Sequence, residues 1–276
     1  MSDIEAGTFD LSGKGNASGA SPIKNVFVLM LENHSFDHIF AMSGIPKINA
    51  ATTKDSNTYG GQTYFVKKGA PPFMTTDPGH EFADVAEQLF AQNGGFAINY
   101  ATSLSEDTGV PTKDHVGDIM ACFDTQAQLP VICQLANEYA ICDQWYSSMP
   151  GPTWPNRFFV HGASSACLDR SPNMLEEVEW ESHLRGFCYE HGSIYQALTA
   201  AKHQWRVYSD CLNRYRDASE WAHGGWIPQV ASLKGVSIFD VHPLDSSRES
   251  TTWADNFAND LKQDYPYAYT FIEPNF

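Results

Sequence analysis

Asn25-Val-Phe-Val-Leu-Met-Leu31 is a short run of apolar and β-branched residues that passes directly into the polar stretch Glu32-Asn-His-Ser35. Such a run predicts a strand that is buried on both faces of a sheet. Ser35 is a residue type that caps helices, and Phe36, Ile39 and Phe40 follow it at helical spacing. The sequence therefore predicts a buried strand, a polar turn and a short helix in this order.

The rest of the chain continues this alternation of strands and helices. We expect helices over 81–92, 116–123, 129–139, 153–163, 193–202 and 252–261, and strands over 140–146, 205–208, 236–239 and 267–272. Residues 43–79 and 164–192 contain many Gly, Pro and polar residues and are typical of loops. Short apolar strands that alternate with helices predict an α/β fold, with a mainly parallel sheet and helices on both faces.

Length and charge narrow the class of protein. The chain has 276 residues, with 17 Lys and Arg against 33 Asp and Glu, which gives a net charge of −16. We find no repeat and no shift in composition, so we expect one domain over 23–276 behind a flexible tail over 1–22. The acidity argues against a nucleic-acid partner and against electrostatic docking on anionic lipid. It leaves open a phosphate-bearing substrate, because a bound cation can reverse the local field.

Targeting signals and cysteines add two further expectations. No apolar run reaches the roughly 18 residues of a membrane span, and the N-terminus lacks the basic and apolar regions of a secretory signal. The six cysteines are dispersed and form no CxxC pair, which argues against a zinc knuckle and against a disulfide-built scaffold. Reduced thiols are the default, and a disulfide among Cys167, Cys188 and Cys211 is the alternative.

The first candidate site follows the first predicted strand. Ligands of parallel sheets bind beyond the carboxyl ends of the strands, and Glu32 and Asn33 stand at such an end. Carboxylate and amide oxygens suit a hard divalent cation. The alternative is an ordinary charged strand exit, in which Asn33 and Ser35 cap the next helix. Glu273 follows the last predicted strand, so it is expected at the same rim.

The second candidate site is the stretch Met149-Pro-Gly-Pro-Thr-Trp-Pro-Asn-Arg157. It places Thr153 at the predicted start of a helix, where free N–H groups and partial positive charge favour an anion such as phosphate. Arg157 could bind phosphate oxygens through its guanidinium fork. Thr153 could act as a nucleophile if a metal ion lowered the pKa of its hydroxyl. The alternative is that Thr153 only caps the helix.

Two histidines have both a functional and a structural interpretation. His80 ends the segment Asp77-Pro-Gly-His80, which precedes a helix, and it could bind phosphate or supply a proton. His161 lies four residues after Arg157 on one helix face, and packing in the core is its expected role. Several tryptophans could line an apolar substrate site, although core packing is the default for them. These are Trp205, Trp221, Trp226 and Trp253.

Taken together, four segments resemble one known family. They are residues 32–38, 77–80, 151–157 and 272–274, which occur here in that family's order. The family is the phosphoesterases that include bacterial and plant non-specific phospholipase C and an acid phosphatase branch. Its fold is related to the alkaline phosphatase superfamily, so the resemblance implies an α/β/α sandwich.

The resemblance also implies roles for single residues. Glu32 and Asn33 would bind a divalent metal ion, and Thr153 would be the nucleophile that forms a phospho-enzyme. Residues near the phosphate would be Asn156, Arg157 and His80. The implied activity is hydrolysis of a phosphoester, with phospholipid among the candidate substrates. The alternative is a catalytically impaired chain that only binds phosphate or a partner.

One departure from the family's pattern concerns the end of the chain. Members of the family continue past the segment 272–274 to an acidic motif of the form Asp-Glu…Gly…Asp-His, which is absent here. We therefore expect a chain that is truncated at its C-terminus, with weak metal binding and with its last strand at an open sheet edge. Relatives of this kind are often exported, so the compartment stays open.

Overall fold

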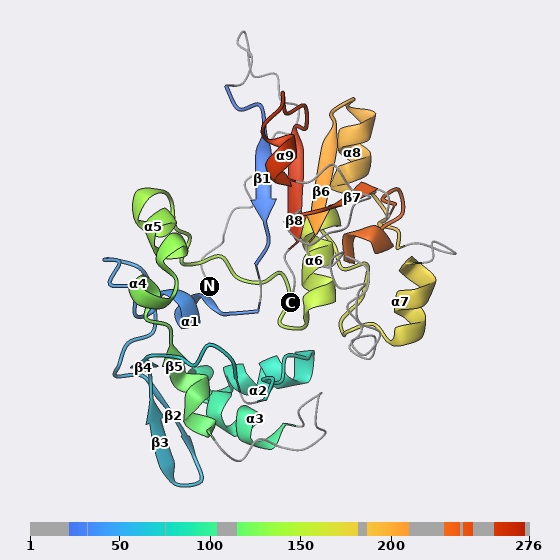
Figure 1. Ribbon diagram of the computed structural model, residues 1–276. Helices are drawn as coiled ribbons and strands as arrows, with labels where there is room; N and C mark the ends of the chain where they lie inside the picture. Colours follow the sequence, from blue (N-terminus) through green and yellow to red (C-terminus); the bar gives the residue numbers. More distant parts are fainter. Residues whose placement is uncertain are drawn as a thin grey trace, which may run out of the picture.

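The computed structural model (Figure 1) describes most of the chain. The described residues are 22–31, 33–74, 76–103, 115–181, 187–209, 229–237, 240–244 and 257–273. The predicted tail over 1–22 lies almost wholly outside them.

The architecture is built around a four-stranded sheet. Its strands are β1 (Val26–Leu29), β6 (Trp205–Ser209), β7 (Val241–Pro243) and β8 (Tyr269–Glu273), in the order β1-β8-β6-β7. All three pairings are parallel. The carboxyl ends of these strands therefore meet at one edge of the sheet, which confirms the predicted parallel α/β arrangement.

Helices cover both faces of this sheet. Tyr208 is paired in register with Ile272, so its side chain and that of Phe271 point to opposite faces. Phe257 of α9 packs on Tyr208, with ring centroids 5.1 Å apart. His161 of α6 packs on Phe271, with centroids 4.8 Å apart. The helix α9 thus lies on one face and α6 on the other, as the sequence predicts.

The helices have the following bounds. They are α1 (Phe36–Phe40), α2 (Phe82–Asn93), α3 (Phe96–Thr102), α4 (Thr125–Gln128), α5 (Pro130–Glu138), α6 (Thr153–Gly162), α7 (Met174–Glu181), α8 (Ile194–Ala200) and α9 (Phe257–Asp260), with 3₁₀ turns at Val116–Met120 and Gln229–Ser232. Capping hydrogen bonds explain where two of these helices begin. The Ser35 hydroxyl accepts the His38 amide, and Ser193 forms a capping box with Gln196 ahead of α8.

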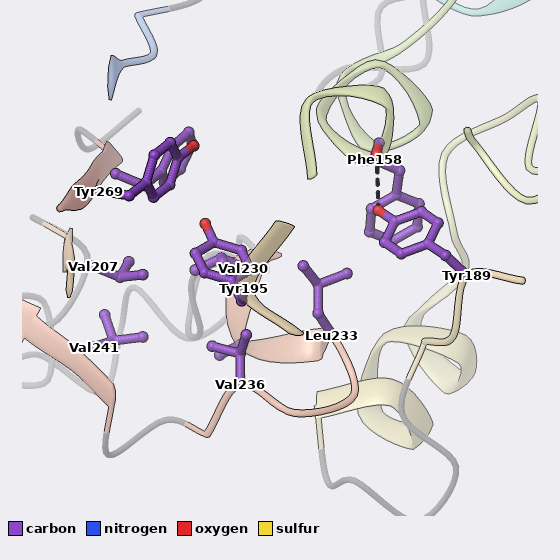
Figure 2. Packing of buried hydrophobic residues seen from close by; sticks show 11 residues of the cluster. Phe158, Tyr189, Tyr195, Val207, Val230, Leu233, Val236, Val241 and Tyr269 are labelled. Carbon is purple, nitrogen blue, oxygen red and sulfur yellow. Dashed lines mark hydrogen bonds between the residues drawn. The ribbon is translucent and has the colours of Figure 1, made fainter. Parts of the chain in front are cut away.

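The main core lies between the sheet and α6 with α8 (Figure 2). Phe158, Tyr195, Val207 and Phe271 are fully buried in it. The Tyr189 hydroxyl donates to the Phe158 carbonyl over 2.9 Å, so the polar tip of this tyrosine is satisfied within the apolar cluster. The core therefore fixes α6 against the sheet.

A second group of short elements accompanies α2 and α3 (Figure 1). The hairpin of β2 (Ser56–Tyr59) and β3 (Gln62–Phe65) turns at Gly60-Gly61, where both residues have positive φ. The strand β4 (Lys67–Lys68) pairs in parallel with β5 (Ala121–Cys122). The predicted loop over 43–79 thus contains a hairpin whose turn signal lies in the two glycines.

The environment of the first strand differs from the prediction. Val26, Phe27 and Leu29 are 47%, 45% and 55% exposed, so β1 is not buried on both faces. The reason is its place at an edge of the sheet, because β8 is its only neighbour among the strands that the structure describes. Conversely, β8 was expected at an open edge and lies inside the sheet, between β1 and β6.

Three further local predictions were wrong. Residues 140–146 form no strand, and Trp145 and Tyr146 are exposed there. Residues 116–123 form a 3₁₀ turn followed by β5 rather than a helix. The predicted loop over 164–192 contains α7. A short apolar run fits a strand, a helix or a surface segment equally well, and distant contacts decide between them.

The end of the chain is described in part. Of the strand expected over 236–239, residues 236–237 are described and form no strand, and β7 begins at Val241. Of the helix expected over 252–261, the described part contains α9. Among the helices that the structure describes, none is long and apolar enough to cross a membrane.

Substitution of Phe271 tests the core directly. We expect Phe271→Ala to lower the free energy of unfolding by about 3–5 kcal/mol, because it opens a cavity between β8 and α6. Phe73→Ala is the matched control, since Phe73 is 86% exposed and a surface substitution changes stability by at most about 0.5 kcal/mol. Urea unfolding followed by circular dichroism measures both. Equal losses in the two variants would contradict this packing.

Candidate active site

The carboxyl edge of the sheet brings the ends of β1 and β8 together. The Met30 amide donates to the Ile272 carbonyl over 3.2 Å, which extends the β1–β8 pairing by one residue. Asn33 follows three residues later and is exposed, while Glu32 lies outside the described residues. Asn33, the described member of the predicted pair of metal ligands, therefore follows a strand whose carboxyl end pairs with that of β8.

The helix α6 begins at the residue that the sequence singles out as a nucleophile. Pro152 occupies the N-cap position and Thr153 is the first helical residue, so Thr153 is not the cap. Pro152 and Pro155 carry no N–H. The donors that the first turn directs away from the helix are therefore the amides of Thr153 and Trp154. A helix start of this kind attracts an anion.

The side chain of Asn156 holds the turn that leads into the helix. Its amide nitrogen lies 3.1 Å from the Met149 carbonyl, 3.1 Å from that of Gly151 and 3.0 Å from that of Pro152. Its amide oxygen accepts the Met149 amide over 3.1 Å. Asn156 thus fixes the backbone before Thr153, and its predicted contact with phosphate stays a prediction.

Arg157 forms an ion pair with Glu273 inside the protein. The guanidinium Nη1 bonds to the carboxylate Oε1, and both side chains are 1% exposed. A buried charge is tolerated only when it is paired and hydrogen-bonded. The pair therefore ties the first turn of α6 to the last residue of β8. The side chain of Arg157 therefore lies in the protein interior, and its direct contact with phosphate stays a prediction.

These contacts place the two candidate sites at one edge. Thr153 lies one helical turn before Arg157, and Arg157 reaches Glu273 at the end of β8. The exit of β1 toward Asn33 runs beside that same strand end. In Figure 1 the start of α6 lies below the carboxyl ends of β1 and β8. The start of α6 and the ends of β1 and β8 thus meet at one edge, and the proximity of Asn33 and Thr153 stays a prediction.

The segment that carries His80 also approaches the start of α6. A Cβ atom built on Gly151 would lie 4.0 Å from the Cα of Phe82, two residues after His80. The His80 ring Nδ1 lies 3.2 Å from the Pro78 carbonyl and 3.5 Å from the Asp77 carboxylate. His80 thus lies near the turn before Thr153, with one ring nitrogen held by its own segment.

A partly buried polar network that the sequence does not reveal holds this segment in place. The Gln88 amide donates to the Gly79 carbonyl over 2.6 Å and to the Asn99 side-chain oxygen over 2.8 Å. The Asn99 amide in turn donates to Asp84 and Glu87 over 3.0 Å and 2.8 Å. Gly79 packs so closely on Asp84 that a Cβ atom there would lie 2.6 Å from the carboxyl carbon. This contact explains the glycine before His80.

His161 packs in the core, as expected. It is buried on the inner face of α6, and its Nδ1 lies 3.3 Å from the Tyr195 hydroxyl. Burial lowers the pKa of His161 to about 3, and the nearby positive charge of Arg157 contributes to the shift. The ring is therefore neutral at pH 7. Burial likewise raises the pKa of Tyr195 well above its ordinary value.

The described residues offer only part of a metal site. Among them no group of three or more His, Cys, Asp or Glu side chains converges in a way that could hold a metal ion. Asn33 supplies one amide oxygen, whereas a hard divalent cation takes about six oxygen ligands. His34 and His38 lie beside Asn33, and burial lowers the pKa of both, that of His38 to about 4. The donors present do not complete the predicted site.

The cysteines in the described part of the chain carry free thiols. They are Cys122, Cys133, Cys142, Cys167 and Cys188. Burial raises the pKa of the Cys122 thiol to about 11, so this thiol stays protonated. Cys211 lies outside the described residues. The reduced state expected for Cys167 and Cys188 is therefore confirmed here.

Comparison with known proteins identifies the family of this chain. The phosphoesterase family matches residues 23–276, which include every candidate residue named above. The chain belongs to the phosphoesterase family. This membership confirms the resemblance that the four sequence segments indicate.

Individual relatives are phospholipases C of plants and bacteria. The chain is 36% identical over 156 residues to non-specific phospholipase C6 of Arabidopsis thaliana, covering 55% of this chain and 30% of the relative. It is 35% identical over 151 residues to non-specific phospholipase C1 of the same plant, covering 52% and 28%. To the hemolytic phospholipase C of Pseudomonas aeruginosa it is 25% identical over 207 residues, covering 72% and 27%. The chain thus spans less than a third of the length of these three relatives.

Loss of the buried ion pair tests the anchor of α6. We expect Arg157→Ala to lower the free energy of unfolding by about 3–5 kcal/mol, because it leaves the Glu273 carboxylate buried without its cation. Arg170→Ala is the control, since Arg170 forms an exposed pair with Glu176 and such pairs contribute little. Chemical denaturation measures both variants. A similar small loss in each would show that the Arg157 pair does not anchor the helix.

The buried histidine makes stability depend on pH. The unfolded chain binds a proton at His161 below pH 6.5, whereas the folded chain does so only near pH 3. Stability from this residue is therefore complete above pH 6.5 and declines on acidification, by up to about 1.4 kcal/mol per pH unit. We expect the melting temperature of His161→Leu to fall less between pH 7 and 5.5 than that of the wild type. Parallel declines would refute this assignment.

Proposed function

We propose that this chain carries the nucleophile of a phosphoester hydrolase of the phospholipase C type. The observation that carries the proposal is the position of Thr153, at the first residue of α6 and at the carboxyl edge of the sheet. Membership of the phosphoesterase family supports the reaction class. The names of the relatives support a phospholipid substrate.

The proposed reaction proceeds in two displacements at phosphorus. The Thr153 oxygen loses its proton and attacks phosphorus in line with the leaving alcohol, whose oxygen takes up a proton as the P–O bond breaks. A phosphothreonine ester forms on Thr153. Water then attacks the same phosphorus, and the threonine oxygen leaves and regains its proton. The products are the free alcohol and the phosphate-bearing group.

The start of α6 supplies the electrostatic part of this chemistry. The Thr153 and Trp154 amides and the positive end of the helix would stabilise charge on the equatorial phosphate oxygens. Asn156 keeps the preceding turn in place, so these donors need no rearrangement. Arg157 and Glu273 hold the helix itself. In this proposal Asn156 and Arg157 position the start of α6, in addition to any direct contact that they make with phosphate.

His80 is the proposed proton donor to the leaving alcohol. Its segment packs beside the turn that precedes Thr153, and the network of Gln88, Asn99 and Asp84 fixes that segment. The Asp77 carboxylate and the Pro78 carbonyl near its Nδ1 hold the ring in place. This role would make hydrolysis depend on a histidine in its protonated form.

A divalent metal ion at Glu32 and Asn33 belongs to the same proposal. Bound there, it would lower the pKa of the Thr153 hydroxyl and offset charge on phosphate. The support for it is the position of Asn33 at the strand exit and the resemblance of residues 32–38 to the family's motif. The described donors leave such a site incomplete, so we expect it to bind metal weakly.

A second candidate function is phosphate binding without turnover. The observation that favours it is the start of α6, whose first-turn amides suit an anion without any step of hydrolysis. In this case the start of α6 would still hold a phosphate group. Calorimetry with inorganic phosphate, run beside a hydrolysis assay, distinguishes the two functions.

Substitution of Thr153 tests the nucleophile. With p-nitrophenyl phosphorylcholine and a divalent cation, we expect Thr153→Ala to lower kcat by about 10³-fold or more. Thr153→Ser should keep part of the activity, because its hydroxyl can still attack phosphorus. Thr102→Ala is the control, since Thr102 bonds to the Ile98 carbonyl on α3 and lies on another helix.

The outcomes separate the candidate functions. Near wild-type turnover by Thr153→Ala would exclude Thr153 as the nucleophile. Phosphate binding without turnover in the wild type would favour the second function. A phosphorylated Thr153 peptide, trapped by acid quench and found by mass spectrometry, would support the proposed covalent intermediate.

A further inference from the structure

Two histidines beside the carboxyl edge point their rings toward each other. The Nδ1 atoms of His34 and His38 lie 2.9 Å apart. The ring centroids are 4.6 Å apart and the planes are inclined by 71°. His34 is exposed and precedes the capping Ser35, whereas His38 lies within α1. The spacing of four residues puts both rings on one side of the helix start.

The surrounding structure holds both rings in place. His38 stacks on Phe123 with centroids 4.5 Å apart and an interplanar angle of 11°. His34 makes an edge contact with the same ring at 5.3 Å. The Phe123 amide also donates to the His38 carbonyl over 2.8 Å. The two nitrogens therefore face each other in a preformed arrangement rather than on free side chains.

The contact requires a specific proton arrangement. Two Nδ1 atoms at hydrogen-bond distance share one proton, so at least one of the rings is neutral. If the ring that carries this proton moved it to its Nε2 atom, both Nδ1 lone pairs would become available. A metal ion could then replace the shared proton without any net release of protons from two neutral rings.

The distance between the nitrogens selects the kind of ion. Nitrogens that each lie about 2.0–2.1 Å from a metal are about 2.9 Å apart when the N–metal–N angle is about 90°. This angle belongs to the tetragonal geometry of Cu²⁺ and Ni²⁺, whereas tetrahedral Zn²⁺ needs a wider separation. We propose that His34 and His38 form a two-nitrogen chelate for a borderline transition metal ion of tetragonal geometry, with water in its other positions.

This chelate differs in chemistry from the oxygen site proposed at Glu32 and Asn33. Imidazole nitrogens select Ni²⁺ and Cu²⁺, whereas carboxylate and amide oxygens select Mg²⁺, Ca²⁺ or Mn²⁺. The histidine site does not depend on phosphoester hydrolysis, and it would exist in a chain without turnover. Because His34 is exposed, the ion would be reached directly from solvent.

Titration with Ni²⁺ tests the proposal, because this ion does not oxidise the free thiols. We use the full chain with its exposed cysteines alkylated, and follow binding by calorimetry. We expect one Ni²⁺ to bind with a dissociation constant on the order of 10 µM, as two nitrogen ligands supply only part of the free energy of a four-ligand site. His34→Gln should weaken binding at least 10-fold. Mg²⁺ should give no competition.

A control variant makes the result specific. His115→Gln removes another exposed histidine that lies outside the pair, and it should leave Ni²⁺ binding unchanged. Selective paramagnetic broadening of the His34 and His38 ring signals in NMR spectra provides a second readout. Absence of Ni²⁺ binding to the wild type, or equal binding by His34→Gln, would overturn the proposal. An equal loss in His115→Gln would overturn it as well.

Discussion

The buried pair of Arg157 and Glu273 is the constraint on which the rest of the site depends. Both charges lie in the interior of the protein, where neither could remain without the other. One partner is in the first turns of α6 and the other is the last residue of β8. The fold must therefore bring the start of this helix to the carboxyl edge of the sheet. The apolar packing of α6 on Phe271 reinforces the same placement on the inner face.

This placement involves three segments that are distant in the sequence and that each carry a candidate residue. The exit of β1 carries Asn33 to the edge, the network of Gln88 and Asn99 holds the segment of His80, and α6 presents Thr153. The protein as a whole has a net charge of −16, which repels an anionic substrate at long range. In the proposed reaction, donors at the helix start would therefore supply the local attraction for phosphate, and a bound cation would be the second source.

The sequence predicted those features that local patterns determine. The helix from Thr153, the cap at Ser35 and the last strand depend on short-range signals, and each was found; the last strand was predicted over 267–272 and is β8 (Tyr269–Glu273). The exposure of β1 depends instead on the order of the strands, which is a long-range property. The partner of Arg157 lies 116 residues away, and no spacing rule links the two. For the same reason, the hydrogen bonds of Gln88 and Asn99 that hold the segment of His80 could not be found from the sequence.

A crystal structure of the chain with inorganic phosphate would test most directly whether these segments form one site. The account predicts a phosphate ion at the Thr153 and Trp154 amides, with the side chain of Asn33 facing the same hollow and Arg157 still paired with Glu273 behind the helix. It would be contradicted by a phosphate bound elsewhere on the protein, or by coordinates that put Asn33 and Thr153 on opposite sides of the sheet edge.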